Sequence, residues 1–280
     1  MTHISNQTMD QERALYALKN ATVEYCTFAG PSDGESALKE ARKVTVKYCN
    51  FSLRYPFWHT EEFRIENTTF DEGVRAPLWY AKNGAMTHCT MKGVKMLREC
   101  DNVKFSHCDI VSEEFGWRCK NVSLDRCSVV SQYFLFETKG GGLSNVKMKG
   151  KYSFQYTEDL TVENCDLDTK DAFWHSKNVT VKNCTVKGEY LGWYSENLTF
   201  INCKIIGTQP LCYCKNLTLI DCTMEETDLS FEYSSVNATV KGSIDSVKNP
   251  ASGKIVADAI GEIILEDSVM ATDCEIIVNS

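Results

Sequence analysis

VTVKNCTV (179–186), LTFINCKI (198–205) and LTLIDCTM (217–224) are three evenly spaced copies of one phrase. LTVENCDL (160–167), VSLDRCSV (122–129), VKFSHCDI (103–110) and VTVKYCNF (44–51) repeat the phrase further upstream. We call the cysteine of each copy the anchor. Apolar residues occupy alternate positions before the anchor, and this alternation predicts a β-strand. A period near 19 predicts small coils that bury their apolar faces only by stacking on one another.

The anchors form a regular grid along the chain. Cys108, Cys127, Cys165, Cys184, Cys203 and Cys222 follow a 19-residue period, Val146 fills one place, and Cys89, Thr68, Cys49 and Cys26 continue it upstream with small offsets. The grid predicts an all-β protein: a single-stranded, right-handed parallel β-helix of about twelve coils. A leucine-rich arc is the next alternative, but the roughly seven residues between phrases leave no room for its helix.

The same grid predicts how the chain is organised. We expect one β-helix domain over residues 1–280, with an N-terminal cap at 1–14 and degenerate coils at 236–280. DQERALYALKN (10–20) could form a short helix at the N-terminal end, and SVKNPASGK (246–254) suggests a loop. Atypical terminal units are expected where a stack of repeats ends.

Two columns of the repeat have structural interpretations. The anchor cysteines read as an interior ladder of small side chains, because equivalent positions in successive coils point the same way and cannot converge on one metal ion. Asparagines six positions before the anchor predict a hydrogen-bonded ladder at a tight bend; they are Asn20, Asn83, Asn102, Asn121, Asn178, Asn197 and Asn216.

Composition excludes several classes of partner. A net charge of −8 over 280 residues argues against nucleic acid and anionic membranes, which need a basic face. The N-terminus lacks a signal peptide and no apolar run could span a bilayer, so we expect a cytoplasmic protein, with export open if a leader has been trimmed. Disulfides are not expected in that compartment. No metal or cofactor is predicted, and the oligomeric state is left open.

Three further columns could carry chemistry. All five tryptophans lie ten positions before the anchor, and the next column holds histidines, tyrosines and charged residues. A third column, thirteen positions before the anchor, holds mainly tyrosines and acids, including Asp171. Unpaired charges cannot occupy a dry core, so the second column should face solvent. Whether the tryptophans point inward or outward stays open.

If these columns border one groove, they offer sugar-stacking rings and paired carboxylates. The candidate acid/base residues are Glu99, Glu114, Glu137 and Asp171. The candidate substrate-binding residues are Trp58, His59, Trp79, Tyr80, Trp117, Arg118, Tyr156, Trp174, His175, Trp193 and Tyr194. The alternative is that the tryptophans fill wide coils while the charges form surface ion pairs.

The repeat VTVKNCTV…LTFINCKI…LTLIDCTM resembles the pectin-lyase-like superfamily of right-handed β-helices. More narrowly, residues 15–270 resemble a bacterial family of unknown function (DUF3737-like). The resemblance implies the fold. That superfamily includes hydrolases, lyases, esterases, epimerases and non-catalytic adhesins, so the resemblance assigns no catalytic residue. The paired aspartates of polygalacturonases and the calcium-binding acids of pectate lyases are absent here.

We therefore expect a carbohydrate-interacting β-helix, with glycoside hydrolysis as the candidate activity and an oligo- or polysaccharide as the partner. A non-catalytic scaffold that binds another protein remains the alternative. A polysaccharide lyase is a second alternative, supported only by Arg118 and Lys95 as basic residues. Fold alone does not decide among them.

Overall fold

The computed structural model describes residues 2–279 and shows a right-handed parallel β-helix, which confirms the predicted fold class. No helix occurs in residues 2–279. The number of turns is about 15, so the predicted count of about twelve is too low. The count fell short because recognisable anchors end at Cys222, whereas parallel strands continue to Val278.

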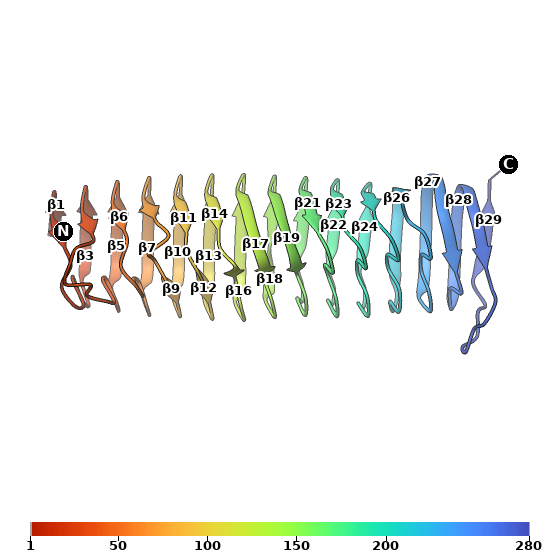
Figure 1. Ribbon diagram of the computed structural model, residues 1–280, viewed down its shortest axis with the longest axis horizontal. Coiled ribbons are helices and arrows are strands. Elements are labelled where there is room, and N and C mark those ends of the chain that lie inside the picture. Colours follow the sequence, from red (N-terminus) through yellow and green to blue (C-terminus); the bar gives the residue numbers. More distant parts are fainter. Residues whose placement is uncertain (1, 280) are drawn as a thin grey trace. The chain divides into compact units, whose positions relative to one another are not determined.

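The chain divides into two compact units, with the boundary between Gly141 and Gly142. In unit 1 (Figure 1), strands one repeat apart pair in parallel, as in Val44↔Phe63 and Gly84↔Val103. One sheet contains β1 (Thr2–Ser5), β3 (Lys19–Glu24), β5 (Arg42–Lys47), β7 (Glu61–Glu66), β10 (Lys82–Thr87), β13 (Asp101–Ser106) and β16 (Lys120–Asp125). After each anchor position comes a strand of the second sheet: β2 (Thr8–Met9), β4 (Thr27–Phe28), β6 (Asn50–Phe51), β8 (Thr69–Phe70), β11 (Thr90–Lys92), β14 (Asp109–Val111) and β17 (Ser128–Phe134). Three short strands lie elsewhere in these coils: β9 (Leu78–Trp79), β12 (Leu97–Arg98) and β15 (Glu114–Phe115).

Unit 2 repeats this arrangement, with register pairs such as Val162↔Val181 and Val181↔Phe200. Its first sheet contains β20 (Thr161–Glu163), β22 (Thr180–Lys182), β24 (Thr199–Ile201), β26 (Leu217–Glu225), β27 (Ser235–Lys248), β28 (Ser252–Ile264) and β29 (Glu275–Val278). The second sheet contains β19 (Lys147–Ser153), β21 (Asp166–Thr169), β23 (Thr185–Lys187) and β25 (Lys204–Ile206). Strand β18 (Lys139–Ser144) contains the unit boundary.

Two local predictions at the ends are wrong. The proposed helix at 10–20 is absent, because Arg13, Leu15 and Ala17 adopt positive φ and form the same bends as later coils. The proposed loop at 246–254 is shorter than expected. Only residues 249–251 separate β27 from β28, since parallel pairing continues on both sides of Pro250.

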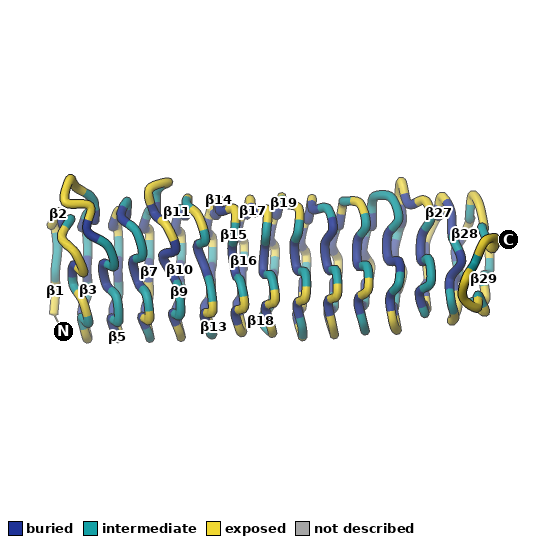
Figure 2. Tube along the Cα trace, turned by 60° about the horizontal axis from the view of Figure 1, so that its bottom comes forward, coloured by how far each residue is buried: buried dark blue, intermediate teal, exposed yellow. Residues whose placement is uncertain are grey.

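The core consists of the alternating apolar residues and the anchors. Figure 2 shows buried stretches alternating with exposed bends along each coil. Cys108 and Cys203 are 1 % and 2 % exposed, so the predicted interior ladder is confirmed. Burial raises the pKa of the Cys49 thiol to about 11, and burial likewise raises that of Cys214 to about 11. These thiols are neutral packing groups near pH 7.

The asparagine ladder is also confirmed in unit 2. Asn178 donates to Asp159 at 2.9 Å, and Asn197 and Asn216 each donate to the asparagine one coil earlier at 2.8 Å. These residues have φ near +52°, a left-handed conformation that asparagine tolerates. A second ladder, directly before the anchor, was not predicted: Asn202 donates to Asn183 at 2.9 Å.

Candidate functional site

The bend before each first-sheet strand determines where the tryptophans point. Phe57 and His59 have φ of +60° and +57°, with Trp58 between them. The strand alternation therefore fails here: Phe57 is fully buried, Trp58 is half-buried and His59 is exposed. The same pattern surrounds Trp174. The tryptophans thus lie against the outside of the coils, and the column after them faces solvent.

In unit 1 the faces of the tryptophan rings are covered by their neighbours. Trp58 and Trp79 stack at 5.3 Å with planes 5° apart. Arg98 lies between Trp79 and Trp117, with its guanidinium 4.6 Å and 5.1 Å from the two ring centroids. His59 and Tyr80 stack in the same way, at 4.8 Å. Ring edges rather than faces therefore meet solvent, which makes this column a poor platform for sugar rings.

The indole N–H groups of this column are also engaged. Trp58 donates to the Ala76 carbonyl at 2.6 Å, and Trp79 donates to the Lys95 carbonyl at 2.8 Å. Each bond links one coil to the next. In the part of the chain that the structure describes, the Trp117 Nε1 has no partner. Trp58 and Trp79 therefore stabilise the contact between adjacent coils in unit 1.

The three candidate carboxylates of unit 1 each lie near a cation. Glu114 pairs with Lys95 at 3.6 Å and Arg98 at 3.4 Å. Glu137 binds the Arg118 guanidinium at 2.7 Å. That hydrogen bond, with a smaller contribution from the charge of Glu99, raises the pKa of Arg118. Glu99 and Glu137 thus lie near Arg118, whereas Glu114 pairs with Lys95 and Arg98.

Unit 2 holds the most desolvated candidate carboxylate. Asp171 is 8 % exposed, and it occupies the same column of the repeat as Tyr152 and Tyr190. Its backbone N–H binds the Glu189 carbonyl at 3.0 Å, which brings the next coil alongside. Burial raises the pKa of the Asp171 carboxyl despite the opposing charges of Lys170 and Lys151. A carboxyl in such surroundings can hold its proton at a higher pH than a solvated one.

Glu189 is a candidate that the sequence prediction missed. Its carboxylate lies 2.6 Å from the Lys170 ammonium, and its charge contributes to raising the pKa of Asp171. Glu189 directly precedes Tyr190 of the third column, so extending each column by one residue would have found it. Asp171 and Glu189 therefore form an interacting pair of acids in adjacent coils.

Glu189 lines a groove of about 410 Å³ within unit 2, and Asp171 directly follows the lining residue Lys170 without lining the groove itself. The groove lining includes Gly150, Asp168, Lys170, Lys187, Gly188, Glu189, Gly207, Thr208 and Glu226. A Cβ on Gly188 would lie 2.1 Å from the Thr169 carbonyl oxygen, and one on Gly207 would lie 2.3 Å from the Gly188 oxygen. The base of the groove is therefore bare backbone, while its sides carry acids and lysines.

Aromatic residues also lie near this groove. Trp174 and Trp193 stack at 5.5 Å, and Trp174 donates to the Tyr190 carbonyl at 2.6 Å. Tyr190 meets the Trp193 ring edge-on at 5.4 Å. Trp174 and Trp193 are thus connected to the Asp171 region through Tyr190.

The remaining candidates of unit 2 form an outer stack. Tyr156, His175 and Tyr194 stack at 4.9 Å and 5.1 Å. Tyr213 continues the stack at 4.8 Å from Tyr194. Tyr156 and Tyr194 are 49 % and 46 % exposed, but their faces meet neighbouring rings. This column offers ring edges and hydroxyl groups to a ligand.

Residues 2–279 contain no cluster of three or more His, Cys, Asp or Glu side chains suited to a metal ion. No helix that could cross a membrane occurs in this range.

Several solved structures are similar to this chain at low identity. PfbA, a surface adhesin of Streptococcus pneumoniae, is 10 % identical over 83 % of this chain and 72 % of that chain, with a TM-score of 0.41. The A-module of mannuronan C-5 epimerase AlgE6 from Azotobacter vinelandii is 9 % identical over 93 % and 90 %, also with a TM-score of 0.41. The catalytic domain of a GH87 α-1,3-glucanase in complex with tetrasaccharides is 8 % identical over 99 % and 64 %, with a TM-score of 0.33.

The sequence comparisons are more specific. Among curated proteins, no sequence matches this chain. A family model described as "Protein of unknown function (DUF3737)" matches residues 2–277. The match covers nearly the whole repeat array, and the chain therefore belongs to the DUF3737 family.

Proposed function

We propose that the protein binds a carbohydrate in the groove of unit 2 and hydrolyses it, with Asp171 as general acid and Glu189 as its partner. The observation that carries the proposal is the burial of Asp171, which raises its pKa, together with the charge of a second acid, Glu189, that lines an open, polar groove. Glycoside hydrolysis requires one carboxyl that keeps its proton and a second that stays ionised.

Each residue then has a definite task. The Asp171 carboxyl donates its proton to the glycosidic oxygen as the bond breaks. The Glu189 carboxylate, paired with Lys170 at 2.6 Å, activates a water molecule or attacks the anomeric carbon. The anomeric configuration of the product distinguishes these two routes. Asp168, Lys187 and Thr208 line the groove and can hydrogen-bond sugar hydroxyls.

The test combines binding with turnover. Purified protein is screened against an oligosaccharide array, and ligands that bind are followed for release of reducing ends. Asp171→Asn and Glu189→Gln should retain binding and lose turnover. Glu225→Gln is a matched control, because Glu225 forms a surface ion pair with Lys204 at 2.8 Å outside the groove lining. Binding without turnover in the unaltered protein would refute the hydrolase, and no binding would refute the carbohydrate site.

A non-catalytic scaffold is the second candidate function. The covered ring faces and paired carboxylates of unit 1 favour it, since these contacts hold adjacent coils together. Absence of any sugar ligand, with a protein partner recovered instead, would support this function. The cytoplasmic location stays a prediction, which fractionation of the source cells would test.

A further inference from the structure

A hollow lies on the outer face of the first sheet in unit 1. Arg64, Ala85 and Lys104 occupy the same position in β7, β10 and β13, with Ala85 in register with both cations. All three side chains belong to the solvent-facing side, and Arg64 and Lys104 are exposed. A short side chain therefore separates two long basic ones.

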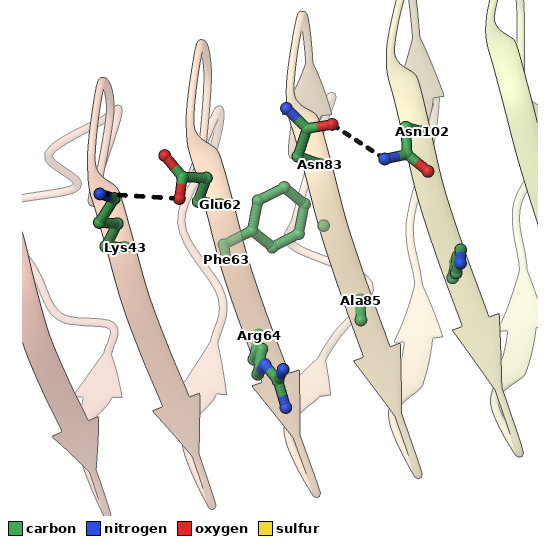
Figure 3. A pocket seen from close by; sticks show the side chains of 9 residues that line it. Lys43, Glu62, Phe63, Arg64, Asn83, Ala85 and Asn102 are labelled. Atoms are coloured by element: carbon green, nitrogen blue, oxygen red, sulfur yellow. Dashed lines mark hydrogen bonds and ion pairs between the residues drawn. The ribbon is translucent and has the colours of Figure 1, made fainter.

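The hollow has a volume of about 520 Å³ (Figure 3). Behind it, the buried ring of Phe63 fills the space that Gly84 leaves, since a Cβ on Gly84 would lie 1.9 Å from that ring. Phe63 thus covers the backbone of Gly84 on the core side, whereas the solvent side of Gly84 lines the hollow. The remaining lining consists of Lys43, Glu62, Asn83 and Asn102.

Unlike three other cations of the same sheet, these two lack acidic partners. On the same sheet, Arg42 pairs with Glu61 at 3.5 Å, Lys43 with Glu62 at 3.9 Å and Lys47 with Glu66 at 3.3 Å. Arg64 and Lys104 form no ion pair with any residue between 2 and 279. The one carboxylate in the lining, Glu62, is already paired with Lys43. A local positive charge therefore persists on a protein whose net charge is −8.

Amide groups add donors at the edge of the hollow. Asn102 donates from its Nδ2 to Asn83 Oδ1 at 2.9 Å (Figure 3). The Nδ2 of Asn83 has no acceptor among the described residues, so its N–H groups are available. A guanidinium, an ammonium and an amide thus surround one small space.

We propose that this hollow binds a tetrahedral oxyanion, a phosphate or a sulfate, either free or as an ester on a larger molecule. Two cations match the two negative charges of such a group. Their backbones are roughly 10 Å apart across two strand spacings, so both flexible side chains can close on one anion over Ala85. Arginine supplies a forked pair of donors suited to phosphate or sulfate oxygens, and lysine supplies a compact charge. The proposal does not depend on hydrolysis in unit 2.

The experiment measures anion binding to the full chain by calorimetry at low ionic strength. Inorganic phosphate and sulfate are titrated first, followed by a hexose phosphate, a hexose sulfate and the unmodified hexose. Arg64→Gln and Lys104→Gln should each weaken binding at least tenfold. Ala85→Leu keeps both charges but fills the hollow, so it should weaken binding as much. Lys47→Gln is the control, since it removes a cation of the same face that is already paired.

The outcomes are separable. Tighter binding of an ester than of the inorganic anion would identify an esterified ligand, and equal binding would identify the free anion. No saturable binding of phosphate or sulfate would overturn the proposal. Equal losses in Lys47→Gln and Lys104→Gln, or full binding by Ala85→Leu, would show a diffuse surface charge and would also overturn it. Thermal unfolding of each variant is the folding control, and the midpoint should stay that of the unaltered protein.

Discussion

Unit 1 and unit 2 carry the same columns, yet their acids lie in different surroundings. In unit 1, Glu114 and Glu137 face lysine and arginine side chains. In unit 2, burial raises the pKa of Asp171, and the charge of Glu189 adds to that shift. A repeat therefore fixes the position of a side chain, while the residues one coil away decide its chemistry.

The largest expected effect separates the acids of the two units. Asp171→Asn should lower turnover of a bound oligosaccharide by about 10²–10⁴-fold, because it removes the general acid. Glu137→Gln should leave turnover unchanged, since Glu137 only pairs with exposed Arg118. Initial rates at saturating substrate measure both. Equal losses would mean that the distinction between the units is wrong.

The groove base should be intolerant of side chains. Gly188→Ala places a Cβ 2.1 Å from a backbone oxygen at φ +155°, so we expect a loss of about 3 kcal/mol in unfolding free energy. Gly242→Ala is the matched control. Gly242 has φ +83° and nothing within 4 Å of its Cβ, so only strain of about 1 kcal/mol is expected. Urea unfolding compares the two, and equal losses would contradict a backbone clash in the groove.

Replacing a tryptophan in unit 1 or in unit 2 should cost a similar unfolding free energy, but the two replacements should affect carbohydrate binding differently. Trp79→Ala and Trp193→Ala each remove a stacked ring and a hydrogen bond, so each should cost about 2 kcal/mol. Only Trp193→Ala should weaken carbohydrate binding, because Trp193 contacts Tyr190 beside Asp171. Ligand titrations of the folded variants test this. Weakened carbohydrate binding in Trp79→Ala would instead indicate that unit 1 contributes to the carbohydrate-binding site.

The smallest effect is a pH dependence of stability. Because the pKa of Asp171 is raised in the folded protein, the unfolded chain ionises first as pH rises above 3.8. Unfolding free energy should then fall with pH until the folded pKa is passed. Asp171→Asn should lack this contribution. Urea unfolding from pH 3 to 7 provides the measurement, and identical profiles would show that Asp171 is solvated.

Several features that the sequence did not predict correctly have physical explanations. Strand alternation could not place Trp58, because positive φ at Phe57 and His59 turns two successive side chains outward. The helix expected near Arg13 does not form, since its residues join the stacked bends of neighbouring coils. Glu189 was missed because its importance depends on Asp171 in the preceding coil, whose burial no pattern revealed.

The sequence by itself determined the β-helix, the buried cysteine column and the asparagine ladder. Each depends on a period that stacks equivalent residues, and a period can be read directly from the chain. Only the tertiary structure decided which acids are paired, which ring faces are covered and which cations stay free. Those properties depend on desolvation and on side-chain contacts between coils. Such contacts change with the identity of single neighbours even when the period is unchanged.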